Sequence, residues 1–242
     1  MALPLLNSFE TVLPDETDLT AVNSGDGSAG NAFDVENIIS PSVIKYDNAR
    51  AAHGNLSARI DHSGANGAYF GWNTSMGAQT QVWGRLYAYR TATPTPDGLW
   101  LVQMQDVGDV TNTLVRWNSD GELHIFDSTL GPVGSSDTVL VPVNEWVRIE
   151  WFILCSVTVG VVECKLFQAD STSPLVTFGM TNCNTGTQVV SAIIGGTAAT
   201  TVGSSTWVDD VALNNTGYPG PAGAGGGGGD NTSSSMMTLG VG

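Results

Sequence analysis

The sequence predicts an all-β protein, a two-sheet antiparallel sandwich of jelly-roll type that ends in a glycine-rich tail. Short runs of β-branched and aromatic residues recur along the chain with turn residues between them, and helical periodicity is almost absent. Only 13% of the 242 residues are charged and 30 are glycine, which is typical of a β-rich globular domain and not of a disordered or a helical chain.

The strand pattern is strongest in segments rich in valine, isoleucine and aromatic residues, which turn sequences such as TPTPDG and GPVGSSD separate. These segments are Gly67–Asn73, Thr80–Arg90, Gly98–Val107, Asn112–Asn118, Glu122–Ser128, Glu145–Leu154, Val161–Asp170 and Ser205–Leu213. Many short strands at regular spacing predict two antiparallel sheets that pack face to face.

The dipeptide Asp120-Gly121 predicts the clearest hairpin. Glycine readily adopts the positive φ that a tight turn between two strands requires. We therefore expect Asn112–Asn118 and Glu122–Ser128 to pair as neighbouring antiparallel strands.

Alternation within Glu145–Leu154 indicates which side of a strand faces the core. The apolar set is Val147, Ile149, Trp151 and Ile153, and the mixed set is Trp146, Arg148, Glu150 and Phe152. Because alternate residues of a strand face opposite sides, this pattern predicts a sheet with one buried face and one partly solvated face.

The charge balance restricts the partners. Lys and Arg number 8 against 23 Asp and Glu, so the formal net charge is −15 and the isoelectric point is about 4.1. A surface with this much negative charge repels phosphate backbones and anionic lipids, which argues against nucleic acid and membranes as partners. Calcium, a neutral glycan or a basic protein patch suits it better, although solubility alone also explains the acidity.

The C-terminal sequence differs in kind from the rest. From Gly217 it reads GYPGPAGAGGGGGD, in which glycine first recurs at every third position and then simply repeats. A collagen triple helix needs a sustained Gly-X-Y repeat, and this one fades after a few triplets. We predict a jelly-roll domain over residues 1–217 and a Gly/Pro-rich, collagen-like tail over 218–242, either a flexible linker or an assembly segment that folds against partners.

Targeting signals are missing from the sequence. The first residues, MALPLLNSFE, have no basic region, and their apolar run stops at Asn7. No later segment approaches the apolar length that spans a membrane. The sequence therefore predicts synthesis and folding in the cytosol.

The three cysteines, Cys155, Cys164 and Cys183, form no CxxC pair, which argues against a zinc ribbon or a redox motif. A two-residue turn at Val159-Gly160 would place Cys155 opposite Cys164, where a cross-strand disulfide is possible. The alternative, which a reducing cytosol favours, is a set of buried thiols that pack as small apolar groups.

Four stretches together resemble a known family: Leu5–Glu10, Asn118–Phe126, Val141–Trp151 and Trp207–Leu213. They look like strands of a concanavalin A-like, laminin-G-like jelly-roll domain, a family that includes many carbohydrate-binding domains and bacteriophage virion domains. The resemblance implies two curved antiparallel sheets in which the first and last strands are adjacent.

The same resemblance implies a structural calcium between the first and last strands. Its ligands map onto Glu10 and onto Asp209 or Asp210, since calcium prefers carboxylate and carbonyl oxygens. Because successive strand residues face opposite ways, we expect only one of the two aspartates to join Glu10. Solvent-facing acids at the rim of the sandwich are the equally favoured alternative.

Sugar-binding domains commonly present aromatic side chains on which the apolar faces of sugar rings pack. Trp83, Tyr87 and Tyr89 share one face of the segment Thr80–Arg90, and Trp72 and Trp100 lie nearby in the sequence. These five residues are the predicted ligand platform, with burial in the core as the competing interpretation.

The sequence predicts no catalytic activity. The E-x-D-x-x-E pattern of glycoside hydrolases on this fold is absent, and Glu122 and Asp127 would face opposite ways on one strand. His53, His62 and His124 are dispersed, and no hydrolase or phosphate-binding motif occurs.

Two functional hypotheses follow. The preferred one is a non-enzymatic structural protein of a bacteriophage virion, a capsid decoration, minor capsid or minor tail subunit that is made in the host cytoplasm. Its partners would be other virion proteins of the capsid or tail shell, with adhesion to host cell-surface glycans as a secondary role. The collagen-like remnant favours a homotrimer. The alternative is a free-standing carbohydrate-binding module with a structural calcium.

Overall fold

The computed structural model describes residues 3–62, 66–95, 98–198 and 204–223, and these ranges are built from β-strands. The strands are β1 (Leu5–Asn7), β2 (Val35–Ile38), β3 (Val43–Asp47), β4 (Ser57–His62), β5 (Asn66–Trp72), β6 (Gln81–Tyr89), β7 (Leu99–Asp106), β8 (Val110–Trp117), β9 (Leu123–Phe126), β10 (Pro132–Ser135), β11 (Val147–Leu154), β12 (Gly160–Gln168), β13 (Val176–Cys183), β14 (Ser191–Ala198) and β15 (Ser204–Asn214). A helix long and apolar enough to cross a membrane is not found within these ranges.

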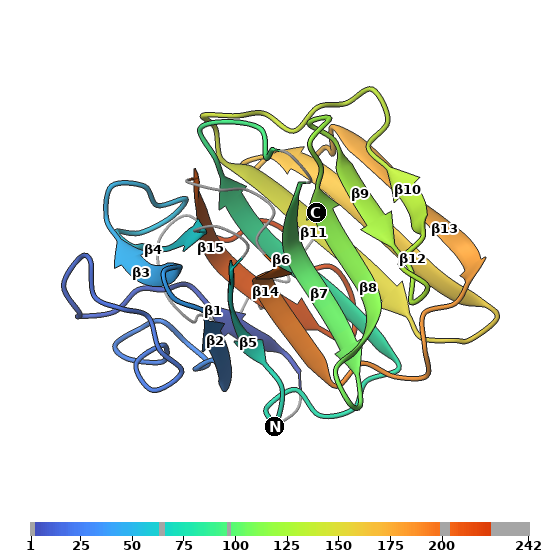
Figure 1. The fold of residues 1–242 in the computed structure, drawn as a ribbon, viewed down its shortest axis with the longest axis horizontal. Helices are drawn as coiled ribbons and strands as arrows, with labels where there is room; N and C mark the ends of the chain where they lie inside the picture. The colour runs from blue at the N-terminus through green and yellow to red at the C-terminus, as the bar shows by residue number, and fades with distance from the viewer. Residues whose placement is uncertain (1–2, 63–65, 96–97, 199–203, 224–242) are drawn as a thin grey trace, which may run out of the picture.

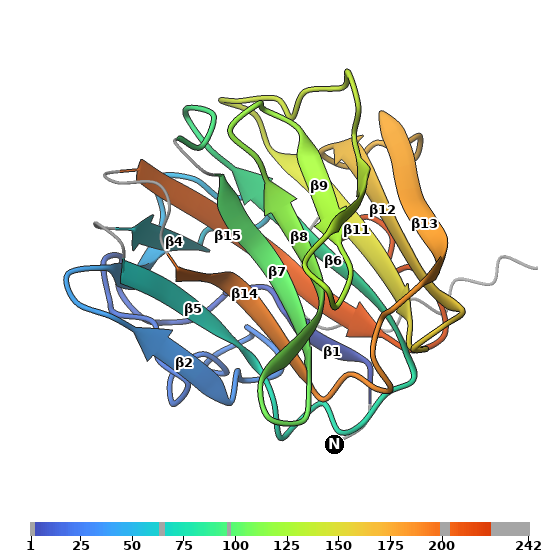
Figure 2. The ribbon, with the colours of Figure 1, turned by 45° about the vertical axis from the view of Figure 1, so that its right-hand side comes forward.

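The strands form two antiparallel sheets, which confirms the predicted sandwich. The eight-stranded sheet has the order β13-β12-β11-β6-β15-β4-β3, and β1 also pairs with β15. The seven-stranded sheet has the order β10-β9-β8-β7-β14-β5-β2 and lies in front of the other sheet in Figure 1. Figure 2 shows the two layers from a second direction.

The first and last strands are neighbours, as the resemblance implied. Leu5 of β1 lies opposite Leu213 of β15, and Asn7 lies opposite Val211. The predicted hairpin is also present, since β8 pairs with β9 and Gly121 in the turn has a φ of 90°.

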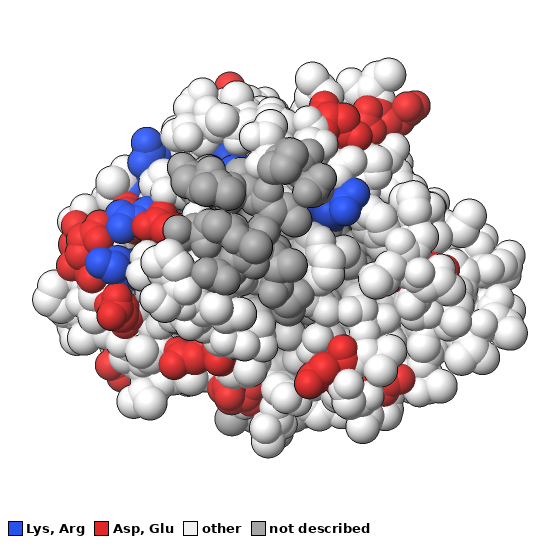
Figure 3. Space-filling view, in the orientation of Figure 1, with Lys and Arg blue, Asp and Glu red and all other residues white. Residues whose placement is uncertain are grey.

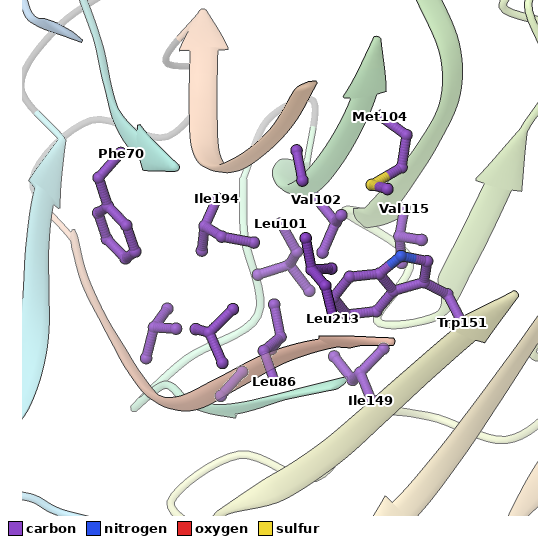
Figure 4. Packing of buried hydrophobic residues seen from close by; sticks show 14 of the residues in the cluster. Phe70, Leu86, Leu101, Val102, Met104, Val115, Ile149, Trp151, Ile194 and Leu213 are labelled. Carbon is purple, nitrogen blue, oxygen red and sulfur yellow. The ribbon is translucent and has the colours of Figure 1, made fainter. Parts of the chain in front are cut away.

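The core fills the space between the sheets, and the apolar set predicted for β11 faces it. Figure 4 shows Ile149 and Trp151 of β11 beside Leu86, with Val115 and Ile194 of the other sheet close by. Gly84 is opposite Trp151 in the neighbouring strand, and a Cβ atom there would lie 2.1 Å from the indole ring. Glycine at position 84 therefore makes room for the tryptophan.

A buried histidine ends strand β4. His62 is 2% exposed, and neither ring nitrogen has a hydrogen-bond partner among the described residues. Burial lowers the pKa of His62 to about 4, and the Arg90 guanidinium contributes in the same direction. The folded state therefore prefers the neutral imidazole.

We predict that His62 makes stability depend on pH between its ordinary pKa of 6.5 and its folded value of about 4. The unfolded chain gains a proton near the upper value and the folded chain only near the lower one, so stability is full above this window and falls as the pH falls through it. The loss is on the order of 3 kcal/mol. Urea unfolding across this pH range should show a smaller loss for His62→Phe than for wild type.

The matched control is Ile60→Val, a core substitution in the same strand that removes no titratable group. It should keep the wild-type dependence on pH. Equal pH slopes for wild type and His62→Phe would show that His62 does not titrate as its burial requires.

Candidate functional site

The outer face of the seven-stranded sheet is hollowed into a groove of about 300 Å³. Strands β2, β5, β7 and β14 and the turns that follow β5 and β7 supply its lining: Val35, Tyr69, Asn73, Gln103, Gln105, Asp109, Ser191 and Ile193. Figure 3 shows this side of the molecule, with acidic side chains along its lower rim and large areas that carry no charge.

Strand register explains why the face is hollow. Val35, Gly71 and Ile193 lie side by side on three neighbouring strands, so a position without a side chain is enclosed by two apolar ones. Tyr69 and Asn73 lie two residues before and after Gly71 and bracket it from the same side of β5. A Cβ atom at position 71 would also lie 2.0 Å from a backbone carbonyl of β14, so the close strand approach requires glycine.

Gln103 supplies a polar group that lacks a partner. Its amide Nε2 donates a hydrogen bond of 2.5 Å to Thr111 Oγ1, and the residue is 4% exposed. Its carbonyl Oε1 is buried and has no hydrogen-bond partner among the described residues. A buried acceptor without a partner is uncommon in folded proteins, and this one belongs to a residue that lines the groove.

The other groove residues add a ring and further amides. Tyr69 is half-buried, and its hydroxyl accepts a hydrogen bond of 3.4 Å from Asn37 Nδ2. Gln105 Nε2 donates to the backbone carbonyl of Asp109 at 3.4 Å. An aromatic ring beside carboxamides can pack against the apolar face of a sugar and exchange hydrogen bonds with its hydroxyls. Among the described residues of the lining, Asp109 is the one carboxylate.

The structure does not bring the predicted aromatic platform together. Trp72 is fully buried, and its indole Nε1 donates to the Ala32 carbonyl at 2.9 Å, so it is a core residue. Trp100 is half-buried on the seven-stranded sheet, outside the groove lining.

The remaining three platform residues lie on β6 and face outward from the other sheet. Tyr87 is 1% exposed, because other segments cover it. Trp83 and Tyr89 are half-buried, and Trp83 stacks on Phe152 with ring centroids 4.5 Å apart. The alternation on β6 places these three rings on one face, as predicted, where Tyr87 is covered and Trp83 and Tyr89 keep part of their surface exposed.

The groove was missed in the sequence, although a signal for it exists. In LVQMQDV, two glutamines alternate with the core residues Val102 and Met104. In YFGWN, Tyr69, Gly71 and Asn73 alternate with buried aromatics. Both patterns place polar groups on one sheet face, and only the pairing of β7 with β14 and of β14 with β5 brings them together.

The expectation that only one of Asp209 and Asp210 could face a given side is wrong, because a β-bulge lies between Asp209 and Ala212. Asp210 is the extra residue and has a φ of 45°. Asp209 Oδ2 accepts a hydrogen bond of 3.2 Å from the His53 backbone N–H, and Asp210 Oδ2 lies 2.5 Å from His53 Nδ1. Both carboxylates therefore contact the same loop.

Two of the carboxylates predicted to hold calcium, those of Glu10 and Asp209, accept hydrogen bonds from backbone N–H groups. Glu10 Oε1 accepts from Asn55 at 2.7 Å and from Leu56 at 3.0 Å, while Asp209 Oδ2 also accepts from Ala52 at 2.8 Å. Glu10 and Asp209 thus hold the two ends of one loop. Burial, and next the neighbouring Asp210, raise the pKa of Asp209 well above its ordinary value.

A possible metal site lies elsewhere, at the β8–β9 hairpin. Asp120, Glu122 and His124 place their ligand atoms within 4.8 Å of one another, and His124 Nε2 lies 3.1 Å from Asp120 Oδ2. The three residues follow one another at intervals of two in the sequence, and this spacing is the signal by which the group could have been found. Calcium prefers oxygen ligands, so the imidazole makes the set less suited to calcium than to a transition metal.

The disulfide that the sequence allowed between Cys155 and Cys164 is not formed, and all three cysteines are free. Strand β12 begins at Gly160, so Leu154 lies opposite Val161. In this register the residue opposite Cys164 is Trp151, not Cys155. The alternative of buried thiols is the one observed for Cys164, which faces the core. Burial raises the pKa of Cys155 to about 12.

We predict that Asp209→Ala destabilises the fold by about 3 kcal/mol, because buried N–H donors lose their acceptor, and that this cost does not depend on calcium. Urea unfolding of wild type and variant with excess EDTA should show the full difference. Asp170→Ala, at a carboxylate whose side chain is 51% exposed, is the control and should cost about 1 kcal/mol or less. If EDTA destabilises the wild type as strongly as the substitution does, the prediction is wrong.

No protein-family model matches the chain, and no curated protein matches it in sequence. Among solved structures, the cellulose-induced protein Cip1 is similar with a TM-score of 0.57 and 16% identity, over 78% of this chain and 94% of that chain. The receptor-binding domain of botulinum neurotoxin D is similar with a TM-score of 0.51 and 8% identity, over 87% of this chain. This chain spans 48% of that structure.

These likenesses concern the fold, since the identities are low. They agree with the two antiparallel sheets described above, and the predicted jelly-roll sandwich is confirmed. The bacteriophage part of the resemblance stays a prediction.

Proposed function

We propose that the chain is a non-enzymatic carbohydrate-binding domain that holds a neutral glycan in the groove of the seven-stranded sheet. The observation that carries the proposal is Gln103 Oε1, which has no partner in the described part of the chain and lies in a groove that also presents the Tyr69 ring and the Gln105 and Asn73 carboxamides. The groove is at the small end of the usual range for ligand sites, which suits one or two sugar units of a longer glycan.

Charge favours a neutral ligand over an acidic one. The groove lining contains no lysine or arginine, and Asp109 places a carboxylate at its edge. The chain as a whole has a net charge of −15. Sulfated or carboxylated glycans would therefore meet repulsion without a compensating cation.

Catalysis does not enter the proposal. Glycoside hydrolysis ordinarily uses two carboxyl groups that flank the scissile bond. Of the described lining residues, Asp109 alone carries a carboxyl group. Binding, by contrast, needs only the ring and the amides.

The proposal takes the alternative of the two sequence hypotheses as the main function. A virion protein could use the same groove to bind host glycans, so the two hypotheses share this site. The virion location, its shell partners and the homotrimer remain predictions that the groove neither requires nor tests.

We predict that Tyr69→Ala weakens glycan binding at least tenfold, which corresponds to about 1.4 kcal/mol, because the sugar loses its aromatic contact. Isothermal titration calorimetry of the full chain with neutral oligosaccharides measures the change. Cello-oligosaccharides are the first to test, since one similar structure is a cellulose-induced protein. An acidic oligosaccharide should bind more weakly than a neutral one of equal length.

Trp83→Ala is the matched control, because it removes an aromatic side chain from the outer face of the opposite sheet. It should leave the affinity within about twofold of wild type. If no neutral oligosaccharide binds, or if Trp83→Ala loses binding while Tyr69→Ala keeps it, the proposed site is wrong.

A further inference from the structure

The outer face of the eight-stranded sheet carries charged side chains that are buried, although they point away from the core. Arg85, Glu150 and Lys165 lie side by side on β6, β11 and β12, and Arg148 lies next to Tyr87 in the adjacent row. Arg85 is 5% exposed, Arg148 1% and Glu150 3%. Other parts of the chain must therefore cover this face.

The turn after β12 covers the part of this face around Arg148. Arg148 donates a hydrogen bond of 2.9 Å to the Ala169 carbonyl and one of 2.8 Å to the Ser171 carbonyl. Its guanidinium also lies 4.0 Å from the centroid of the Phe167 ring. The guanidinium is thus enclosed by carbonyls of the turn and by the Phe167 ring of β12.

The C-terminal segment Asn215–Gly223 covers the part around Arg85 without forming a strand. Arg85 Nη1 donates to the Gly220 carbonyl at 2.9 Å, and the Ala222 N–H donates to the Tyr87 hydroxyl at 3.0 Å. Gln81 Nε2 donates to the Asn215 carbonyl at 3.1 Å. Side chains of β6 therefore recognise the backbone of this segment at three separate points.

Tyr218 is the side-chain anchor of the segment. Its hydroxyl donates a hydrogen bond of 2.6 Å to Glu163 Oε1, and Lys165 Nζ lies 3.8 Å from the centroid of its ring. Burial, and then Glu163, raise the pKa of the Tyr218 phenol, so the hydroxyl keeps the proton that it donates. Hydrogen bonding, cation–π attraction and ring burial all act on this one residue.

The conformation of the segment is that of a peptide preorganised for binding. Pro219 and Pro221 restrict the chain on both sides of Gly220, so little freedom is lost when it docks. Gly220 has a φ of 71°, which glycine adopts readily, and its carbonyl accepts the Arg85 hydrogen bond. These are the features of a bound proline-containing peptide and not of a sheet strand.

We propose that the outer face of β6 and β12 is a peptide-binding site for the sequence of residues 215–223, which a second copy of this chain can supply in place of the chain's own segment. Arg85 and Tyr87 form hydrogen bonds with the peptide backbone, and Glu163 and Lys165 contact the tyrosine side chain. The proposal does not depend on glycan binding, which uses the other sheet.

The test uses the full chain and a fluorescein-labelled peptide with the sequence of residues 215–223, NTGYPGPAG. In wild type, the chain's own segment competes for the site at high effective concentration. Tyr218→Ala weakens that internal competitor. Fluorescence anisotropy should therefore show the peptide binding at least tenfold more tightly to Tyr218→Ala than to wild type.

Two further measurements identify the site. A peptide in which the tyrosine is alanine should bind Tyr218→Ala at least tenfold more weakly than the native peptide. Adding Lys165→Met to Tyr218→Ala should also weaken binding of the native peptide, because the cation–π contact is lost. Tyr218→Phe, which keeps the ring and loses the hydroxyl, should give an intermediate affinity for the free peptide.

The proposal is overturned if the native peptide fails to bind Tyr218→Ala, or if it binds wild type and variant equally. A hydrogen-exchange measurement on wild type gives an independent decision. The Ala222 amide should be protected in wild type and lose protection in Tyr218→Ala, and equal exchange in both would contradict a docked segment.

Discussion

The β-bulge in the last strand is the constraint on which the eight-stranded sheet depends. β15 pairs with β4 before the bulge and with β1 after it, so the extra residue lies where the neighbour changes. The bulge turns Asp209 and Asp210 toward one loop, and the Asp210 carbonyl accepts a hydrogen bond of 3.1 Å from Arg85 Nε. Arg85 in turn holds Gly220, so one backbone irregularity links the first strand, a loop and the C-terminal segment.

On the outer face of the eight-stranded sheet, described segments of the chain lie over the strands, whereas the other outer face has the groove. On the eight-stranded sheet, buried guanidinium groups are satisfied by carbonyls of a turn and of the C-terminal segment. On the seven-stranded sheet, the groove contains glycine at position 71 and the carbonyl of Gln103, which has no partner among the described residues. This is the face on which we propose that a small polar ligand binds.

Local pattern was enough to predict the sandwich and the inward face of β11, because alternation over a long strand reports burial directly. It missed β14, whose glycines at 195 and 196 hide the strand pattern, and β13, which is largely exposed. The bulge at Asp210 leaves no mark in the local sequence, so the two aspartates were assigned to opposite faces. The groove depends on pairing between β5, β14 and β7, and β5 and β14 are far apart in the chain, which alternation within one segment cannot reveal.

We propose that the ligand site lies on the seven-stranded sheet, while segments of the chain cover the opposite face. A titration of isotopically labelled full-length protein with a neutral oligosaccharide, followed by amide chemical shifts, tests this placement. We expect saturable shifts in β2, β5, β7 and β14 and no change in the shifts of β6, β11 and β12. Saturable shifts on β6, β11 and β12 in place of the others would show that the proposed placement is wrong.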